Sequence, residues 1–252
     1  MAYLRSIAFM LALALFTPPY ALLMILCFPL PHRARRYTAV PWVYLTAWLI
    51  EHLLGIEYRV IGSENIPARP AVILSKHQSA WETVVLQKVF PLALFVWKRE
   101  LKWQLPFFGW ALAVIPMISI DRQAGKNALL QLIEQGRQRL AQGYPVIIFP
   151  EGTRVPPGQH RRYKIGGAQL AVASGALALP LVHNAGEFWG RNAFFKRPGI
   201  ITVSIGPPID PQGKSAEEVN NQAESWMEAE MARISPRYYP HESPQPSAQA
   251  AA

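Results

Sequence analysis

A histidine and a glutamate stand five positions apart in the segment LSKHQSAWETVV, where a short apolar run ends. His77 follows a candidate strand over residues 71–74, and the end of a strand just before a helix is where open α/β sheets build their sites. A carboxylate such as Glu82 can accept the proton on one imidazole nitrogen, which leaves the other nitrogen free to take a proton from an alcohol. His77 and Glu82 are therefore a candidate general base and its orienting acid, without a serine nucleophile.

The same stretch also matches a capping box, since Ser79 is followed three residues later by Glu82. In that interpretation Ser79 opens a helix over residues 80–89, Glu82 reaches back to a backbone amide, and His77 is an ordinary loop residue. The two roles of Glu82 are compatible, so the sequence leaves both open.

A second polar turn, FPEGTR, follows the apolar candidate strand over residues 144–149. Gly152 lets the backbone approach a ligand closely, and the planar guanidinium of Arg154 suits phosphate oxygens. Glu151 and Thr153 belong to the same turn. The alternative is a plain turn with an exposed arginine.

Two further stretches carry cations. MISIDRQ places Asp121 and Arg122 after another candidate strand, a weak signal alone, and the segment HRRYKIGG adds more basic side chains. VWKRELKWQLPFFGW sets Lys98, Arg99 and Lys102 beside aromatic residues, a combination that suits the head and tails of a phospholipid. The alternative for this stretch is a solvated charge run followed by core aromatics.

The overall composition favours an anionic partner. Of 252 residues 51% are apolar, and 25 Lys and Arg against 16 Asp and Glu give a formal charge of +9. Such a balance fits polyanions or an anionic membrane surface. The single cysteine, Cys27, has no partner for an intrachain disulfide. The histidines show no ligand spacing for a metal, so we expect no metal or other cofactor.

The N-terminal region argues for a membrane rather than a nucleic acid. Residues 7–30 contain no charged side chain, and the length of this segment is close to the ~20 apolar residues that a membrane-spanning helix needs. The basic run HRARR follows it, as expected for the cytoplasmic flank of a membrane segment. A cleaved secretory signal is the competing interpretation. Pro18 and Pro19 leave spanning and one-leaflet insertion open. The shorter apolar stretch over residues 41–56 suits the headgroup boundary or, alternatively, a core helix. We expect residues 1–56 to form a membrane-associated helical hairpin.

From residue 57 the pattern changes to short β-branched runs that alternate with segments of helical period. This alternation predicts an α/β domain over residues 57–235, with a mixed, largely parallel sheet flanked by helices. The candidate strands are residues 57–61, 71–74, 92–96, 113–120, 144–149, 177–182 and 200–205. Surface helices are predicted over 124–142 and 215–234. The Pro-, Gln- and Ser-rich residues 236–252 are predicted to be a disordered tail.

Together these stretches resemble the glycerolipid acyltransferase family, most closely bacterial 1-acyl-sn-glycerol-3-phosphate acyltransferases. The family's His-x-x-x-x-Asp motif is similar to His77–Glu82, its arginine-bearing second motif to ISIDR, its third to FPEGTR, and its proline-containing fourth to LALPLV. The resemblance covers roughly residues 72–210. One departure is Glu82, where the family usually has Asp, and the extra methylene extends the side chain by ~1.5 Å.

The resemblance implies transfer of a fatty acyl group from acyl-CoA or acyl-carrier protein to the sn-2 hydroxyl of lysophosphatidic acid, giving phosphatidic acid. His77 would act as the base and Glu82 would orient it. Arg122 and Arg154 would hold the phosphate, with Lys98, Arg99 and Lys102 as further candidates. Glu151, Gly152 and Thr153 would shape the acceptor pocket, Glu151 by meeting a glycerol hydroxyl.

The resemblance also implies an enzyme of the cell inner membrane with its catalytic domain on the cytoplasmic face, acting on membrane lipids. Three alternatives stay open: an acyltransferase for another lysolipid such as lyso-ornithine lipid, a hydrolase or transacylase with the same base, and a non-catalytic protein that binds anionic lipid. The sequence does not choose between the two donors, and it does not give the acyl-chain length or the oligomeric state.

Overall fold

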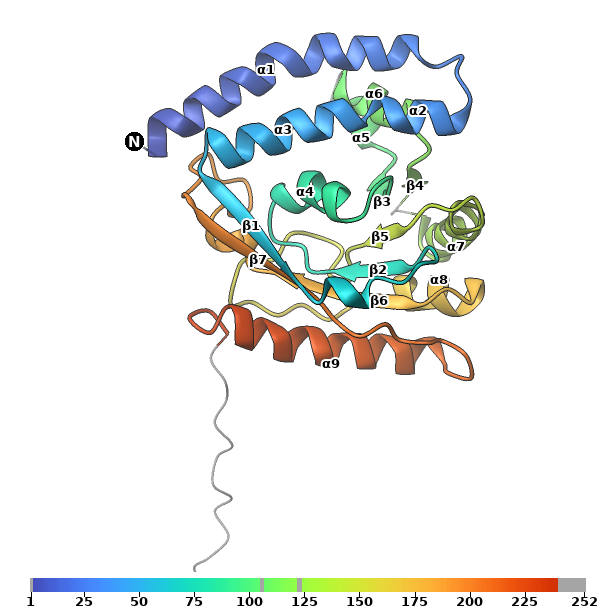
Figure 1. The fold of residues 1–252 in the computed structure, drawn as a ribbon. Helices are drawn as coiled ribbons and strands as arrows, with labels where there is room; N and C mark the ends of the chain where they lie inside the picture. The colour runs from blue at the N-terminus through green and yellow to red at the C-terminus, as the bar shows by residue number, and fades with distance from the viewer. Residues whose placement is uncertain (1, 105–106, 122–123, 240–252) are drawn as a thin grey trace, which may run out of the picture.

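The computed structural model describes residues 2–104, 107–121 and 124–239 (Figure 1). The chain begins with three helices, α1 (Ala2–Leu26), α2 (His32–Thr38) and α3 (Val40–His52). Helices α1 and α3 run antiparallel along one side of the molecule, and α2 lies in the turn between them (Figure 1). The residues predicted to form a hairpin therefore fold as one, with an additional short helix at its bend.

Helix α1 continues through Pro18 and Pro19 and is the one helix in the described ranges that is long and apolar enough to cross a membrane, by length and composition alone. Its residues Phe9, Ala21 and Met24 are buried against the domain. Most of its remaining surface is exposed and apolar. The position of α1 agrees with membrane association.

The second apolar stretch, α3, has two different faces. Val43, Ala47 and Ile50 are buried, and the helix packs against α4 (Trp81–Val89) and the first strand. Tyr44 and Trp48, by contrast, are about half exposed, at 53% each. The core-helix interpretation fits the first face and the headgroup-boundary interpretation fits the second.

A sheet of seven strands in the described part of the chain forms the centre of the domain. The strands are β1 (Ile56–Ile61), β2 (Val72–Ser75), β3 (Leu94–Lys98), β4 (Ile118–Ile120), β5 (Val146–Ile148), β6 (Ala178–His183) and β7 (Gly199–Ile205). Their order is β1-β7-β6-β2-β5-β3-β4, and the pairing is parallel except between β6 and β7. The predicted mixed, largely parallel sheet is confirmed.

Two predicted strands are too long, since the strand predicted over residues 144–149 is only Val146–Ile148 and another overlaps a helix. The prediction placed a strand over residues 113–120, but helix α6 (Phe108–Val114) includes its first two residues and β4 begins only at Ile118. Pro116 explains the boundary, because a residue before proline is disfavoured in the helical region. Ile115 is accordingly extended, with φ −82° and ψ 153°.

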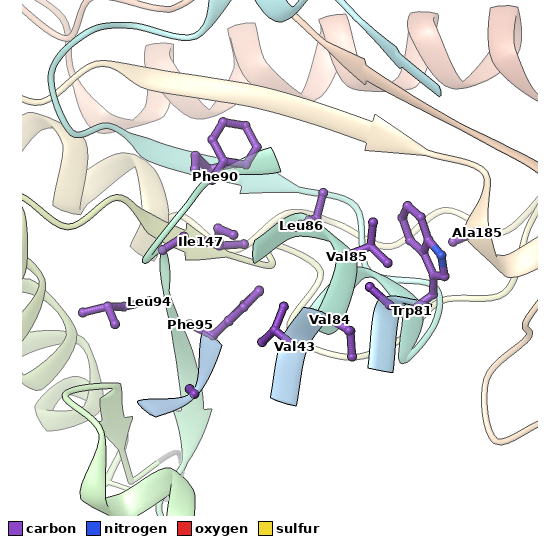
Figure 2. Packing of buried hydrophobic residues seen from close by; sticks show 14 of the residues in the cluster. Val43, Trp81, Val84, Val85, Leu86, Phe90, Leu94, Phe95, Ile147 and Ala185 are labelled. Carbon is purple, nitrogen blue, oxygen red and sulfur yellow. The ribbon is translucent and has the colours of Figure 1, made fainter. Parts of the chain in front are cut away.

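Apolar side chains pack on both faces of the sheet, with the period of two that strands impose. In β2, Ile73 joins the cluster beneath α1, α3 and α4, while Val72 and Leu74 join the cluster on the opposite face. The first cluster includes Val43, Trp81 and residues of α4, seen at close range in Figure 2. The second is covered by α7 (Lys126–Ala141), α8 (Gly166–Ser174) and α9 (Ala216–Ile234) (Figure 1).

The C-terminal helix starts where the sequence predicts. Ser215 and Glu218 form a reciprocal capping box at the start of α9. The predicted tail starts too early, because residues 236–239 form turns and Tyr239 packs against the apolar cluster of α9. The rest of that tail, residues 240–252, lies outside the described residues. Short helices α5 (Leu101–Gln104), η1 (Ser63–Asn65) and η3 (Ala185–Glu187) complete the described elements.

Candidate active site

His77 lies just past the carboxyl end of β2, at the edge of the sheet. Its Nδ1 is 2.8 Å from Oε1 of Glu82, and its ring stacks on Phe149 with centroids 3.9 Å apart. The carboxylate accepts the Nδ1 proton, so in the neutral ring Nε2 is the nitrogen that can accept a proton. The pair predicted from the sequence therefore forms, and the longer Glu82 side chain reaches the imidazole.

Glu82 is completely buried, and its carboxylate accepts hydrogen bonds from the backbone besides the one from His77. Its Oε1 accepts from the backbone amides of Gln78 and Ser79 at 3.0 and 2.8 Å, and Oε2 accepts from Ser79 at 3.0 Å. The helix begins at Trp81 with Ala80 at its N-cap, one residue later than the capping-box interpretation places it. Ser79 Oγ accepts from the amide of Trp81 instead of completing a capping box. Glu82 thus fixes both the imidazole and the loop that carries it.

A second histidine lies behind this pair. His183 is fully buried, and its Nε2 is 4.0 Å from Oε2 of Glu82. Because its Nδ1 accepts from the amide of Ala185, its Nε2 carries the proton and donates to the carbonyl of Lys76. Burial lowers the pKa of His183, which keeps its ring neutral.

The pKa of Glu82 is also lowered. Burial alone would raise it, but the imidazole of His183, the hydrogen bond from His77 and the amide of Ser79 together outweigh burial. Glu82 therefore stays ionised beside the imidazole of His77.

Lys76 and Glu151 form a buried ion pair beneath the loop that carries His77. Lys76 Nζ is 2.7 Å from Glu151 Oε1 and 2.9 Å from Glu228 Oε1 of α9, and neither Lys76 nor Glu151 is exposed. Glu151 Oε2 accepts from the backbone amide of His77 at 2.7 Å. Tyr163 donates its hydroxyl proton to Glu228 at 2.9 Å. This network ties the backbone of His77 to the C-terminal helix.

The position of Glu151 corrects one expectation. The resemblance implied that Glu151 meets a glycerol hydroxyl, but its oxygens face Lys76 and the amide of His77, and its carboxylate has no exposed surface. Burial raises the pKa of Glu151, although the ammonium of Lys76 opposes the rise. Glu151 supports the backbone of the loop that carries His77 and does not face the space in front of the imidazole.

The other residues of the FPEGTR turn face the same space as His77. Gly152 has φ +71°, a left-handed conformation that glycine adopts without strain, and an added Cβ would lie only 3.0 Å from the side chain of Lys164. Val155 donates its amide proton to the carbonyl of His77 at 2.7 Å, which holds the two turns together. Gly152, Thr153 and Arg154 line a cavity together with His77. The Nε of Arg154 is buried and has no hydrogen-bond partner among the described residues.

That cavity has a volume of about 550 Å³ and runs from His77 under the N-terminal helices. Its rim is polar and carries Lys98, Arg154 and Arg191 besides His77. Its interior is apolar and is lined by side chains of α1, α3, α4, α6 and β3, among them Met24, Val43, Val84, Phe95 and Ala111. The site thus joins a base and cations to a space suited to a hydrocarbon chain.

The predicted cations do not all lie at this rim. Lys98 lines the cavity, whereas Arg99 and Lys102 line a separate hollow of about 230 Å³. Arg99 also donates to Gln131 Oε1 at 3.2 Å, and the ammonium of Lys102 lies 5.1 Å from the ring centroid of Trp103. Arg122 lies outside the described residues.

Several residues of the site were missed by sequence reasoning. His183, Glu228 and Arg191 lie more than 100 positions from His77, and no local motif marks them. Phe149 was noted only as the first letter of FPEGTR, although its ring supports the imidazole. Lys76, adjacent to His77, had the only available signal: a lysine in an otherwise apolar strand end needs a buried carboxylate.

Comparison with known proteins identifies the family of the chain. The Acyltransferase family model matches residues 57–184, which include His77, Glu82 and the FPEGTR turn. The chain belongs to the acyltransferase family. The resemblance seen in the sequence motifs is thereby confirmed.

Relatives of this acyltransferase share most of its length. A 1-acyl-sn-glycerol-3-phosphate acyltransferase of Pseudomonas aeruginosa is 47% identical over 222 residues, which cover 86% of each chain. The alpha form of the enzyme so named in Mus musculus is 31% identical over 69% of this chain and 62% of its own. The crystal structure of the 1-acyl-sn-glycerophosphate (LPA) acyltransferase PlsC of Thermotoga maritima shares the fold, with a TM-score of 0.75, 23% identity and coverage of 92% of this acyltransferase and 95% of that chain.

Proposed function

We propose that this acyltransferase moves a fatty acyl group from an acyl thioester to the sn-2 hydroxyl of 1-acyl-sn-glycerol-3-phosphate, giving phosphatidic acid. The observation that carries the proposal is the His77–Glu82 pair at the polar rim of an apolar cavity. The names of the relatives support the choice of acceptor. Acyl-CoA and acyl-carrier protein are both donors of the required kind, since each presents a thioester.

The reaction begins with the base. Nε2 of His77 takes the proton of the sn-2 hydroxyl while the oxygen attacks the thioester carbonyl, and the carboxylate of Glu82 stabilises the resulting imidazolium. When the tetrahedral intermediate collapses, the carbon–sulfur bond breaks and the imidazolium returns the proton to the departing thiolate. The base is then neutral again, so one turnover needs no other proton source and no cofactor.

The acceptor is held at the rim and its chain lies in the interior. The guanidinium of Arg154 is a forked donor for the phosphate monoester, and Lys98 adds a second positive charge. The apolar interior keeps a hydrocarbon chain out of water while the headgroup lies at the rim. General-base action is worth roughly 10²–10⁴-fold, so the positioning of hydroxyl and thioester supplies much of the remaining acceleration.

Membrane association belongs to the same proposal. Helix α1 has no charged side chain after Arg5 and exposes leucines along one side, and the basic segment HRARR follows it. Basic flanks mark the cytoplasmic side of a membrane segment. We infer an enzyme of the inner membrane whose site opens toward the cytoplasmic leaflet, where its lipid substrate resides.

The decisive experiment measures product from lysophosphatidate and from other lysolipids, with both donor types, for wild type and His77→Ala. We expect phosphatidic acid from the wild type and a loss of at least ~100-fold in His77→Ala at unchanged thermal stability. Preference for lyso-ornithine lipid or a lysophospholipid with a larger headgroup would show that this lipid, and not lysophosphatidate, is the acceptor. Release of free fatty acid alone would indicate a hydrolase, and equal transfer by His77→Ala would refute the assigned base.

A further inference from the structure

The loop of residues 191–197, with the sequence RNAFFKR, displays two aromatic rings at the surface. It connects η3 to β7, and Phe194 and Phe195 are 45% and 52% exposed. Their rings pack edge to face with centroids 5.7 Å apart. Two adjacent phenylalanines at the tip of a loop place apolar area in water, where it costs free energy unless a partner covers it.

The loop is held in this shape by helix α1. The backbone amide of Lys196 donates to Ser6 Oγ at 3.0 Å, and its ammonium donates to the carbonyl of Phe194 at 2.8 Å. That ammonium also lies 5.1 Å from the ring centroid of Trp189 and 5.8 Å from that of Phe9. The rings of Phe194 and Phe195 are therefore presented by a fixed loop and do not fold back into the core.

The surface around the two rings points to a lipid bilayer as the partner. Tyr3 of α1 contacts Phe195 with ring centroids 4.8 Å apart, and Leu4 beside it is 67% exposed, so the aromatic tip continues the apolar surface of α1. Three exposed cations flank the patch, Arg5, Arg191 and Arg197. Aromatic rings beside basic side chains match the boundary between headgroups and acyl chains of an anionic membrane.

The loop also borders the candidate active site. Arg191 lines the cavity that contains His77, and its Nη1 donates to the carbonyl of Arg154 at 3.3 Å. A loop that is anchored in lipid at this point places the cavity rim at the level of the headgroups. A lysolipid can then reach His77 from the bilayer with its phosphate still at the surface.

We propose that residues 191–197 are a second membrane-contact element, in which Phe194 and Phe195 insert among the headgroups of an anionic leaflet and set the mouth of the cavity at the bilayer surface. This inference rests on the proposed function for the identity of the lipid that enters. The contact with the bilayer itself is a separate physical property and is measured separately.

The first experiment measures insertion of the loop. Phe195→Cys in a Cys27→Ser background is labelled with an environment-sensitive fluorophore, and the full chain is reconstituted in phosphatidylglycerol vesicles. Leu130→Cys on α7, where the native side chain is 63% exposed, is the matched control. We expect a blue-shifted emission at position 195 that doxyl lipids quench and aqueous iodide does not, with the opposite pattern at position 130. Equal iodide quenching at both positions would overturn the proposal.

The second experiment measures the consequence for substrate entry. In the double variant Phe194→Ser/Phe195→Ser we expect the apparent KM for vesicle-borne lysophosphatidate to rise about tenfold or more, because the two rings that insert in the bilayer are lost. The kcat/KM for a short-chain lysophosphatidate that is monomeric in water should be unchanged. Loss of both activities in a folded variant, or of neither, counts against the entry role. A wild type inactive on every lysophosphatidate refutes the proposed function, while the fluorophore still decides the membrane contact.

Discussion

The most informative perturbation of the site is to remove the charge of Glu82 while keeping its shape. In Glu82→Gln the retained oxygen can stay at the Oε1 position, where it accepts from His77 Nδ1 and from the amides of Gln78 and Ser79. The new NH₂ group then takes the Oε2 position, whose one hydrogen bond is a second, 3.0 Å contact with Ser79. The fold should therefore survive, and removing a fully buried charge also removes its desolvation cost.

The expected loss is catalytic. Two unit charges about 4 Å apart attract by about 4 kcal/mol at an effective dielectric constant of ~20, and each 1.4 kcal/mol of barrier is tenfold in rate. Because the retained hydrogen bond still orients the ring, we expect kcat to fall by about 10²–10³-fold, with little change in the KM for either substrate.

Glu82→Asp is the matched comparison, because it keeps the charge and shortens the side chain by ~1.5 Å. If the negative charge of residue 82 stabilises the imidazolium, the kcat of Glu82→Asp should be at least ~10 times that of Glu82→Gln. The assay is steady-state transfer from acyl thioester to lysophosphatidate, with thermal unfolding of each variant as the control. Activity of Glu82→Gln within about threefold of wild type would refute the reasoning.

The remaining predictions concern the supporting network, the phosphate site and the response to pH. Lys76→Met leaves Glu151 as a buried charge without its ammonium, so the free energy of unfolding should fall by about 3–5 kcal/mol in denaturant titrations, and adding Glu151→Gln should recover part of that loss. Additive losses in the double variant would contradict the ion pair. Arg154→Ala should raise the KM for lysophosphatidate by about 10–100-fold, the equivalent of a charge-assisted hydrogen bond of ~1.5–3 kcal/mol, and the KM for the acyl thioester much less. Equal changes in the KM for lysophosphatidate and the KM for the acyl thioester would show that Arg154 does not bind the phosphate. His183 has a lowered pKa in the folded state, so below its ordinary value of 6.5 the unfolded chain takes a proton that the folded chain does not. Its contribution to stability is therefore complete well above that value and decreases as the pH falls below it. His183→Gln should show a smaller loss of stability between pH 7.5 and 5.5 than wild type, and an unchanged slope would exclude this histidine as the source.

Local chemistry made much of the fold predictable. Short β-branched runs marked the positions of the strands, because a strand between two layers of helices must be apolar on both faces. The helix predicted over residues 215–234 matches α9, whose start is fixed by a Ser215–Glu218 cap that depends only on neighbours in sequence. The strand predicted over residues 113–120 was too long because a helix end and a strand are equally apolar in the run before Pro116, so hydrophobicity could not separate them.

The C-terminal tail shows where prediction from local composition fails. Pro, Gln and Ser from residue 236 onward predict disorder, yet Tyr239 accepts a hydrogen bond from Gln78 Nε2 at 3.2 Å beside the catalytic loop. That contact joins residues 161 positions apart. A composition argument considers each segment alone and cannot include a partner from the other end of the chain.

The sequence by itself determined the pairing of His77 with Glu82 and the position of the FPEGTR turn, because His77 and Glu82 lie within a few positions of each other and their spacing is set by a strand end and one helical turn. Only the tertiary structure decided which other side chains share that site. Packing of α9 against the sheet brings Glu228 to Lys76 and commits Glu151 to an ion pair. The path of the chain after β3 takes Arg99 and Lys102 to another hollow. Charge and burial have to be matched in three dimensions, and a buried carboxylate belongs to whichever cation the fold brings within 3 Å of it.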